Sequence, residues 1–277
     1  MTESDANETR VPGSPAESAD VLSAALLLPG EPVGVRLFTS ADAFDAWPAT
    51  RPETPVYYCA AVHQATLGAS LKLALSDVGC DTSPRTLGLE PGFFDDDFIE
   101  SYVTSDLYRD RSVADAMLAG VAILRGIAGV AVGPLRTFAG DDPPDVVIIA
   151  TTPYGVMRLT QAAAFDGHRI RNTPIGMHGV CAESTAAPHA TGEISVSLLC
   201  SGTRYIAGWD ENLMSVGIPG PLVADVSRGL LATAERFELN DRKDRIRTAC
   251  RRSPGVARPA TTALASLRDE AGYFVHE

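Results

Sequence analysis

The chain has 277 residues, of which 45% are hydrophobic, and its formal net charge at neutral pH is −12. This length allows a substantial core, and no segment approaches the eighteen consecutive apolar residues of a membrane span. The acidic balance argues against nucleic acid and acidic membrane surfaces as partners. Five cysteines in so long a chain do not fit a disulfide-stapled secreted scaffold, so the cytoplasm is the predicted location.

Composition divides the chain into three segments. Residues 1–20 are acidic, contain Pro and Ser, and have no basic region followed by a hydrophobic stretch. We therefore expect a disordered tail there rather than a signal peptide. Residues 21–237 are predicted to form the core, and residues 238–277 a charged appendage. Its basic stretch, Arg242 to Arg252, is either a solvated helix face or a contact for an acidic partner.

The first half of the core contains alternating strand and helix patterns. A strand is expected in the segment VGVRLF, and Ser40 is a plausible N-cap for a short helix through Trp47. Helical spacing follows Cys59 as far as Gly68. Alternating leucines then predict a strand that ends at Cys80, so both cysteines are expected at strand ends.

The middle and second half give further elements. Three consecutive aspartates before Phe98 indicate a solvated helix start, and Ser112 is expected to cap the next helix. The remaining predictions are strands in GVAVGPL, VVIIATT and the region of DENLMSVGIPG, and helices at Pro153–Phe165 and about Leu222–Phe237.

Four of the five cysteines form two pairs of similar spacing. Cys80 follows Cys59 by 21 positions, and Cys200 follows Cys181 by 19. Each pair encloses a small-residue stretch, a glycine and an alternating run. We interpret this agreement as an internal duplication that could bring the two pairs together across a pseudo-twofold axis.

The residues that follow each pair also agree. Arg85 lies five positions after Cys80, Arg204 lies four after Cys200, and a glycine stands eight after each cysteine. The predicted fold class is therefore mixed α+β, a single domain of two pseudo-symmetric halves at about 21–140 and 141–237.

Several blocks of the sequence resemble one large prokaryotic family. They include PVGVRLF, YYCAAVHQATLG, PDVVIIATTPYGVMRLTQAAAFDGHRI, GVCAESTAAPHATGEISVSLLCSGTRYIAG and DENLMSVGIP. Their order over about residues 20–237 is similar to that of the domain of unknown function 169 family. One departure is CDTSPRTLGL, because the family more often has a proline and a glycine directly after the cysteine. The resemblance implies a shared fold and a shared site, and it names no reaction.

Four thiolates suit a soft metal centre. Cys59, Cys80, Cys181 and Cys200 are predicted to ligate an iron–sulfur cluster, with a four-iron four-sulfur cluster favoured and zinc as the alternative cofactor. Two other interpretations stay open, a catalytic or redox thiol pair and small buried apolar side chains. Short two-residue spacings, which would strengthen a metal assignment, are absent.

Six further residues are candidate site groups. Arg85 and Arg204 could clamp a carboxylate or phosphate, or they could pair with nearby acidic residues. Ser201 and Gly202 follow a cysteine in a turn whose amides could bind an anion. His63 and His178 lie close to cysteines in sequence, either as acid–base catalysts or as buried structural residues.

The resulting functional hypothesis is a cytoplasmic iron–sulfur protein, leaning toward an enzyme, with redox or Lewis-acid chemistry on a small anionic molecule. A small-molecule or zinc binding protein and a metal-free thiol enzyme are the alternatives. The expected partners are a small molecule and an electron-transfer protein, with no nucleic acid and no membrane.

Overall fold

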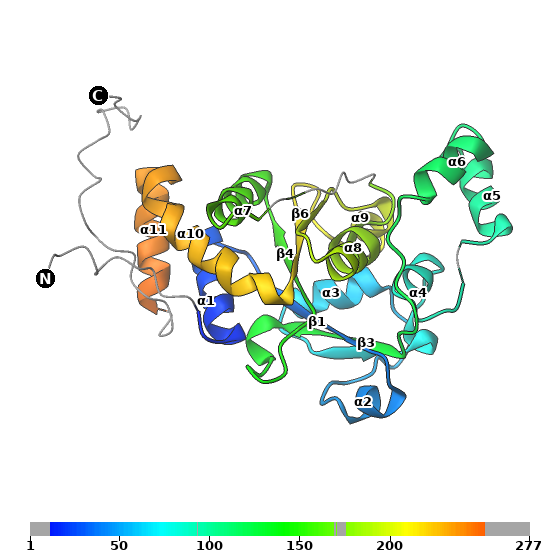
Figure 1. The fold of residues 1–277 in the computed structure, drawn as a ribbon, viewed down its shortest axis with the longest axis horizontal. Coiled ribbons are helices and arrows are strands. Elements are labelled where there is room, and N and C mark those ends of the chain that lie inside the picture. Colours follow the sequence, from blue (N-terminus) through cyan, green and yellow to red (C-terminus); the bar gives the residue numbers. More distant parts are fainter. Residues whose placement is uncertain (1–11, 93, 169, 171–175, 253–277) are drawn as a thin grey trace, which may run out of the picture.

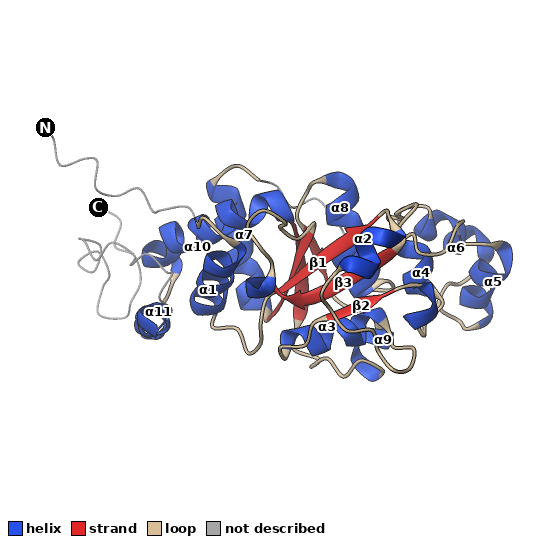
Figure 2. Cartoon of the chain, turned by 90° about the horizontal axis from the view of Figure 1, so that it is seen from below, coloured by secondary structure: helices blue, strands red, loops and turns tan. Residues whose placement is uncertain are grey.

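The computed structural model describes residues 12–92, 94–168, 170 and 176–252. It contains a central antiparallel sheet with helices on both faces (Figures 1 and 2), so the predicted α+β class is confirmed. No helix among the described residues is long and apolar enough to cross a membrane.

Six strands form the sheet: β1 Val33–Phe38, β2 Leu71–Leu73, β3 Gly129–Pro134, β4 Val146–Thr151, β5 Ser195–Ser197 and β6 Met214–Pro219. Their order in the sheet is β2-β3-β1-β4-β6-β5, and every neighbouring pair is antiparallel. The first three strands therefore occupy one half of the sheet and the last three occupy the other. Strands β1 and β4 meet at the centre.

The described helices are more numerous than the strands. The α-helices are α1 Pro15–Leu26, α2 Ala41–Ala46, α3 Tyr58–Thr66, α4 Thr82–Thr86, α5 Asp96–Thr104, α6 Arg111–Leu118, α7 Pro153–Phe165, α8 Ala187–Thr191, α9 Ser201–Tyr205, α10 Val223–Phe237 and α11 Asn240–Arg252. Short 3-10 helices are η2 Leu75–Asp77, η3 Leu135–Thr137 and η5 Gly220–Leu222, and η4 Gly179–Ala186 is a π-helix.

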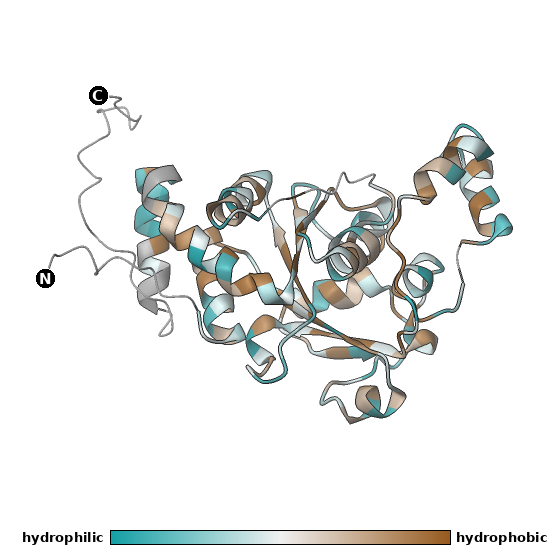
Figure 3. Ribbon diagram, viewed as in Figure 1, coloured by the Kyte–Doolittle hydropathy of each residue, from teal (hydrophilic) through white to brown (hydrophobic). Residues whose placement is uncertain are grey.

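Side chains of β4 alternate between two hydrophobic cores. Val146 and Ile148 join the core that contains α3 and part of η4, whereas Val147 and Ile149 join the core built with α1, α7 and α10. Both faces of the strand are thus covered, as its continuous apolar run predicts. Figure 3 shows hydrophobic and hydrophilic residues alternating along α10, since one face of this helix packs inward.

Several local predictions agree with the structure. Helix α7 has the predicted bounds, and Ser40 caps α2 by accepting a hydrogen bond from the Ala43 amide. Asp95 caps α5 in the same way, which makes the aspartate run a solvated helix start.

Three other local predictions are wrong. Strand β2 ends at Leu73 and gives way to a 3-10 helix, because the Asp77 carboxylate accepts a hydrogen bond from the Ala74 amide and turns the chain. Cys59 lies in a helix rather than at a strand end. The N-cap of α6 is Asp110 rather than Ser112, since the Asp110 side chain accepts from the amide of Val113.

The two ends of the described chain pack together. Helix α1 contacts both α10 and α11 (Figure 1). Between α10 and α11, Glu238 forms a fully buried ion pair with Arg158 of α7, at 2.6 Å. The predicted tail covers residues 1–20, and the predicted appendage covers residues 238–277. Of these, residues 1–11 and 253–277 lie outside the described part of the chain.

Candidate functional site

The four predicted cysteine ligands lie near the N-terminal ends of helical segments. Cys59 is the second residue of α3 and Cys181 lies in η4, and both are buried. Cys200 is the N-cap of α9, and Cys80 lies two residues before α4. All four are free cysteines.

Two of the thiols meet hydroxyl groups in matching positions. Cys80 Sγ lies 2.8 Å from Ser83 Oγ, and Cys200 Sγ lies 3.1 Å from Thr203 Oγ1. Each hydroxyl follows its cysteine by three residues. The short helices α4 and α9 therefore present equivalent groups to the two cysteines.

The two buried thiols are held in their protonated form. Burial raises the pKa of Cys59 to about 12, with further increases from electrostatic interaction with the thiols of Cys200 and Cys80 and an opposing hydrogen bond to Thr203. Burial likewise raises the pKa of Cys181 far above its ordinary range. Because the thiolate is the nucleophilic form, neither thiol is an activated nucleophile at neutral pH.

The predicted iron–sulfur function is therefore wrong. Among the residues that the structure describes, no group of three or more His, Cys, Asp or Glu side chains could hold a metal ion. The prediction was based on the matched spacing of the cysteines in the sequence, and spacing does not determine the geometry that a metal ion requires. The expected electron-transfer partner depended on this cluster.

The two arginines are engaged by groups of the protein itself. Arg85 donates to the Asp81 carbonyl at 2.9 Å, pairs with Asp95 at 3.4 Å, and lies 4.8 Å from the ring centroid of Phe98. Arg204 donates to three backbone carbonyl groups, at 2.7, 2.8 and 3.0 Å. Their role in binding an anion stays a prediction.

The other polar candidates occupy different places. Ser201 and Gly202 form the start of α9. The Nδ1 atom of His63 lies 2.7 Å from the carbonyl oxygen of Ala207, and the imidazole ring is tilted against Trp209 at a centroid distance of 5.7 Å. Since a carbonyl can only accept, the Nδ1 atom of His63 carries a proton. The predicted roles of these three residues are untested.

A cavity of about 390 Å³ lies beside the remaining candidate, His178. Its walls come from α6 and the turn after it, and from η4 and α8, and most lining residues are small or apolar, among them Ala116, Gly120, Ala182 and Ala187. Its volume falls within the roughly 300–1,000 Å³ of typical small-molecule sites.

His178 lines this cavity and has a ring nitrogen without a hydrogen-bond partner. The side chain is 1% exposed, its Nε2 lies 2.7 Å from the hydroxyl of Tyr102, and its Nδ1 is buried without a hydrogen-bond partner. Burial lowers the pKa of His178 to about 4, so the ring is neutral at pH 7. An unsatisfied buried polar group costs about 1–3 kcal/mol, which a ligand atom could offset.

The π-helix η4, which begins directly after His178, also lines the cavity. All eight of its residues are buried, and π-helical segments are rare and frequent at functional sites. Its Glu183 lines the cavity, and the carboxylate accepts hydrogen bonds from the Gly176 amide at 3.1 Å and the Ser197 hydroxyl at 2.6 Å. These donors fix the only formally charged side chain of the described lining.

Aromatic side chains from α5 and the segment before it hold the imidazole in place. Phe94 stacks on His178 at a centroid distance of 5.4 Å and on Phe98 at 4.8 Å. Burial raises the pKa of Tyr102 to about 12, so its phenol keeps its proton. Tyr108 packs against Tyr102, and its buried hydroxyl has no hydrogen-bond partner.

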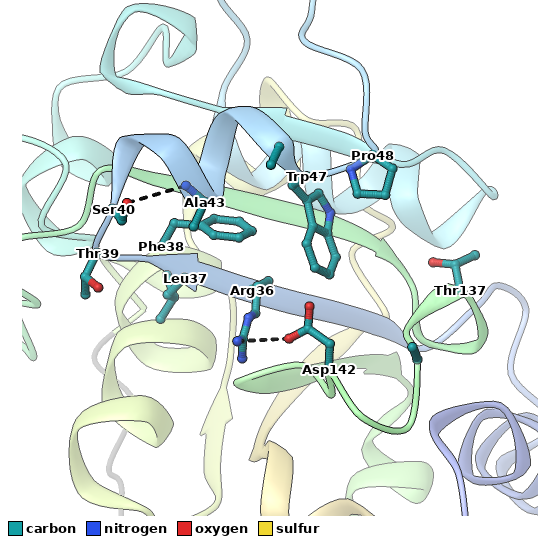
Figure 4. A pocket seen from close by; sticks show the side chains of 12 residues that line it. Arg36, Leu37, Phe38, Thr39, Ser40, Ala43, Trp47, Pro48, Thr137 and Asp142 are labelled. Atoms are coloured by element: carbon teal, nitrogen blue, oxygen red, sulfur yellow. Dashed lines mark hydrogen bonds and ion pairs between the residues drawn. The ribbon is translucent and has the colours of Figure 1, made fainter.

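A second hollow, of about 570 Å³, lies between the end of β1 and α2 (Figure 4). Its polar groups satisfy one another: Arg36 pairs with Asp142 at 2.9 Å, and the Ser40 hydroxyl caps α2. No buried polar side-chain atom of its described lining lacks a partner. The cavity at His178 is therefore the stronger candidate.

Sequence reasoning selected His178 because of its distance from Cys181, and it missed the aromatic side chains that pack around the imidazole. The signal was present, since Phe94, Phe98 and Tyr102 recur at four-residue intervals in FFDDDFIESY. Such spacing places side chains on one helical face. The cavity itself could not be predicted, because Tyr102 and His178 are 76 positions apart.

Comparison with known families gives one match. The model of the family described as uncharacterised ArCR, domain of unknown function 169, matches residues 21–229. No curated protein matches the chain. No solved structure matches it either. Since the matched residues make up most of the chain, the protein belongs to the domain of unknown function 169 family, as the resemblance of its sequence blocks predicted.

Proposed function

We propose that the protein binds a small, largely apolar molecule in the cavity beside His178. The observation that carries this proposal is a cavity of mostly small and apolar residues whose lining includes His178, a residue with a buried, unpartnered Nδ1 atom. Concave apolar sites with a few convergent polar groups are typical of small-molecule binding. A ligand that reaches Nδ1 would supply the hydrogen bond that this nitrogen lacks.

The test uses a blocked cavity. Ala116 lines the cavity and is exposed on α6, whereas Ala119 is exposed three residues later and does not line it. The substitution Ala116→Trp is expected to fill the cavity from its rim, and Ala119→Trp serves as the matched control. Neutral aromatic probes, namely toluene, benzyl alcohol, acetophenone and benzamide, are titrated into each protein.

The expected result is saturable binding to the wild type and to Ala119→Trp, and none to Ala116→Trp. At ten times its Kd, a bound probe should raise the free energy of unfolding by about 1.4 kcal/mol. Chemical shift changes of the amides of α6 and η4 identify the site. Absence of binding by all four probes, or equal binding to both tryptophan variants, would contradict the proposal.

We also infer that the two halves of the sheet descend from an internal duplication. Each half contains three consecutive strands with the third in the middle, and each third strand ends in a proline followed by a 3-10 helix. The pairing agrees as well, because Pro134 faces Val33 and Pro219 faces Val146, the first residues of β1 and β4. Superposition of β1, β2 and β3 on β4, β5 and β6 in an experimental structure tests this inference.

The cytoplasm remains the proposed location. Four free cysteines among the described residues fit a reducing compartment. Fractionation of the native host cells, with detection of the protein in each fraction, would test it.

A further inference from the structure

We infer that the hollow between β1 and α2 binds a neutral sugar, whose ring lies against Trp47 and whose hydroxyl groups contact Arg36 and Asp142. The hollow has a volume of about 570 Å³, within the roughly 300–1,000 Å³ of typical small-molecule sites. Its described lining shares no residue with that of the cavity at His178. Binding of a sugar here is therefore independent of the proposed function.

The alternation of side chains along β1 brings the charged and aromatic groups of the hollow to one face of the sheet. Val33 and Val35 belong to the core that contains α3. Arg36 and Phe38 therefore lie on the opposite face, where α2 packs on the sheet. On that face Phe38 contacts Trp47, at a centroid distance of 5.4 Å. The aromatic and the charged parts of the hollow thus lie next to each other.

The indole of Trp47 is held in place by groups of the protein itself. Trp47 is the C-cap of α2, and its carbonyl accepts a hydrogen bond from Nζ of Lys72 at 3.0 Å. The indole ring also packs against Phe138, at a centroid distance of 5.7 Å. In Figure 4 it extends from the end of α2 toward the pair formed by Arg36 and Asp142. A ligand would meet a ring that needs no reorientation, which lowers the entropic cost of binding.

The guanidinium group of Arg36 is fixed by acceptor groups on neighbouring residues. It lies 2.9 Å from a carboxylate oxygen of Asp142, 3.2 Å from one of Asp145 and 3.2 Å from the carbonyl oxygen of Pro143. The side chains of Arg36 and Asp142 are nevertheless 31% and 45% exposed. A guanidinium has five N–H donors and a carboxylate has two acceptor oxygens, so both groups can form further hydrogen bonds on their exposed side. They offer a ligand donors and acceptors side by side.

This combination fits a ligand with an apolar face and a hydroxylated edge. A hydroxyl group both donates and accepts, so two adjacent hydroxyls can accept from Arg36 and donate to Asp142. The exposed hydroxyl groups of Thr39 and Ser40 line the same hollow and add to its polar side. The face of an aromatic ring carries partial negative charge, which attracts the C–H groups on one face of a pyranose ring. A sugar has both features in one rigid molecule.

The charges of the hollow favour a neutral ligand. Arg36 and Asp142 are the formally charged residues of the described lining, and each compensates the other. Arg36 also lies beside Asp145, so an anionic ligand would meet two carboxylates and one guanidinium. A cationic ligand would compete with Arg36 for Asp142. We therefore expect a neutral sugar to bind more tightly than the corresponding sugar acid.

The chain has two tryptophans, and their indole N–H resonances allow a direct test by NMR of the full-length protein. Trp209 is 4% exposed and its N–H donates to the Cys59 carbonyl at 3.1 Å, so its resonance is an internal control. The probes are the methyl glycosides of glucose, galactose and mannose, with maltose and cellobiose. At least one of them should shift the resonance of Trp47 saturably and leave that of Trp209 unchanged.

Comparison ligands separate the features of the sugar. Sorbitol has the hydroxyl groups without the ring, cyclohexanol has a ring without the set of hydroxyls, and glucuronate adds a negative charge. Each should bind about tenfold more weakly than the tightest sugar, or weaker still, because each loses one favourable interaction or adds a repulsive one.

A matched pair of variants tests the contact with the carboxylate. Asp142→Asn should weaken binding of the tightest sugar by about tenfold. Asp141→Asn removes the same charge from an exposed residue outside the described lining, and it should leave the affinity unchanged. Both variants keep Trp47, so the same resonance reports binding, and Arg36 keeps its contact with Asp145.

Four results would overturn the assignment of this hollow to a neutral sugar. They are the absence of any Trp47 shift with all five sugars, a shift of Trp209 in its place, equal binding by a comparison ligand, and equal affinities of the two asparagine variants. Failure of the aromatic probes at the cavity beside His178 would refute the proposed function alone, since the two sites share no described lining residue.

Discussion

At the residue scale, the environment of His178 couples stability to pH. The pKa of its imidazole is about 4 in the folded chain, against about 6.5 for an exposed histidine in the unfolded chain. Between these values the unfolded chain binds a proton that the folded chain does not. The contribution of the neutral imidazole to the free energy of unfolding is complete above pH 6.5. It decreases by about 3 kcal/mol in total as the pH falls toward 4. Urea unfolding of the wild type and of His178→Phe from pH 7.5 to 4.5 measures this loss of stability. If the free energies of unfolding of the two proteins changed in parallel with pH, the assignment of the effect to His178 would be wrong.

At the element scale, close contact between β6 and η4 fixes the wall of the cavity. A Cβ atom at Gly217 would clash with the Ser184 carbonyl oxygen and lie 2.8 Å from Pro188 Cγ. Gly217→Ala should therefore displace η4, lower the free energy of unfolding by about 1–3 kcal/mol and weaken probe binding. Gly140 has open space around it, so Gly140→Ala is the control, with a change within about 0.5 kcal/mol. Thermal unfolding, urea unfolding and benzamide titration check both variants. Equal changes in stability and in benzamide binding for the two variants would refute the role of the contact between β6 and η4.

The same elements show what the sequence could predict. Helix α7 has a proline in its first turn and an apolar period of one helical face, and β4 is a continuous apolar run, so local pattern was sufficient for both. The π-helix η4 is buried all round and has neither a helical nor a strand period, so its local pattern predicted no element. The position of Cys59 was mispredicted for a related reason, since it lies in a helix where a strand end was expected.

At the scale of the whole molecule, the C-terminal helices are part of the core rather than an addition to it. Glu238 accepts from Arg158 and from the Tyr154 hydroxyl, and Ile246 of α11 is buried against α1. A chain that ends at Phe237 would leave Arg158 as a buried charge without Glu238. We expect this truncation to lower the free energy of unfolding by at least about 3–5 kcal/mol.

The control for this truncation is a chain that ends at Arg252, which keeps the contacts that the described residues make with one another. Circular dichroism and urea unfolding compare both with the full-length protein. If the chain that ends at Phe237 were as stable as the chain that ends at Arg252, the buried ion pair would contribute little to the fold.

The order of the strands also bears on how the protein is made. During synthesis β1 leaves the ribosome long before β4, its partner at Val33–Val35, and α1 leaves it long before α10 and α11, which cover its apolar face. A nascent chain therefore carries an open strand edge and an uncovered hydrophobic helix until its last helices emerge. The described part of the chain can complete its folding only after α11 has been synthesised, and a chain stalled or released before that point is the form most exposed to aggregation.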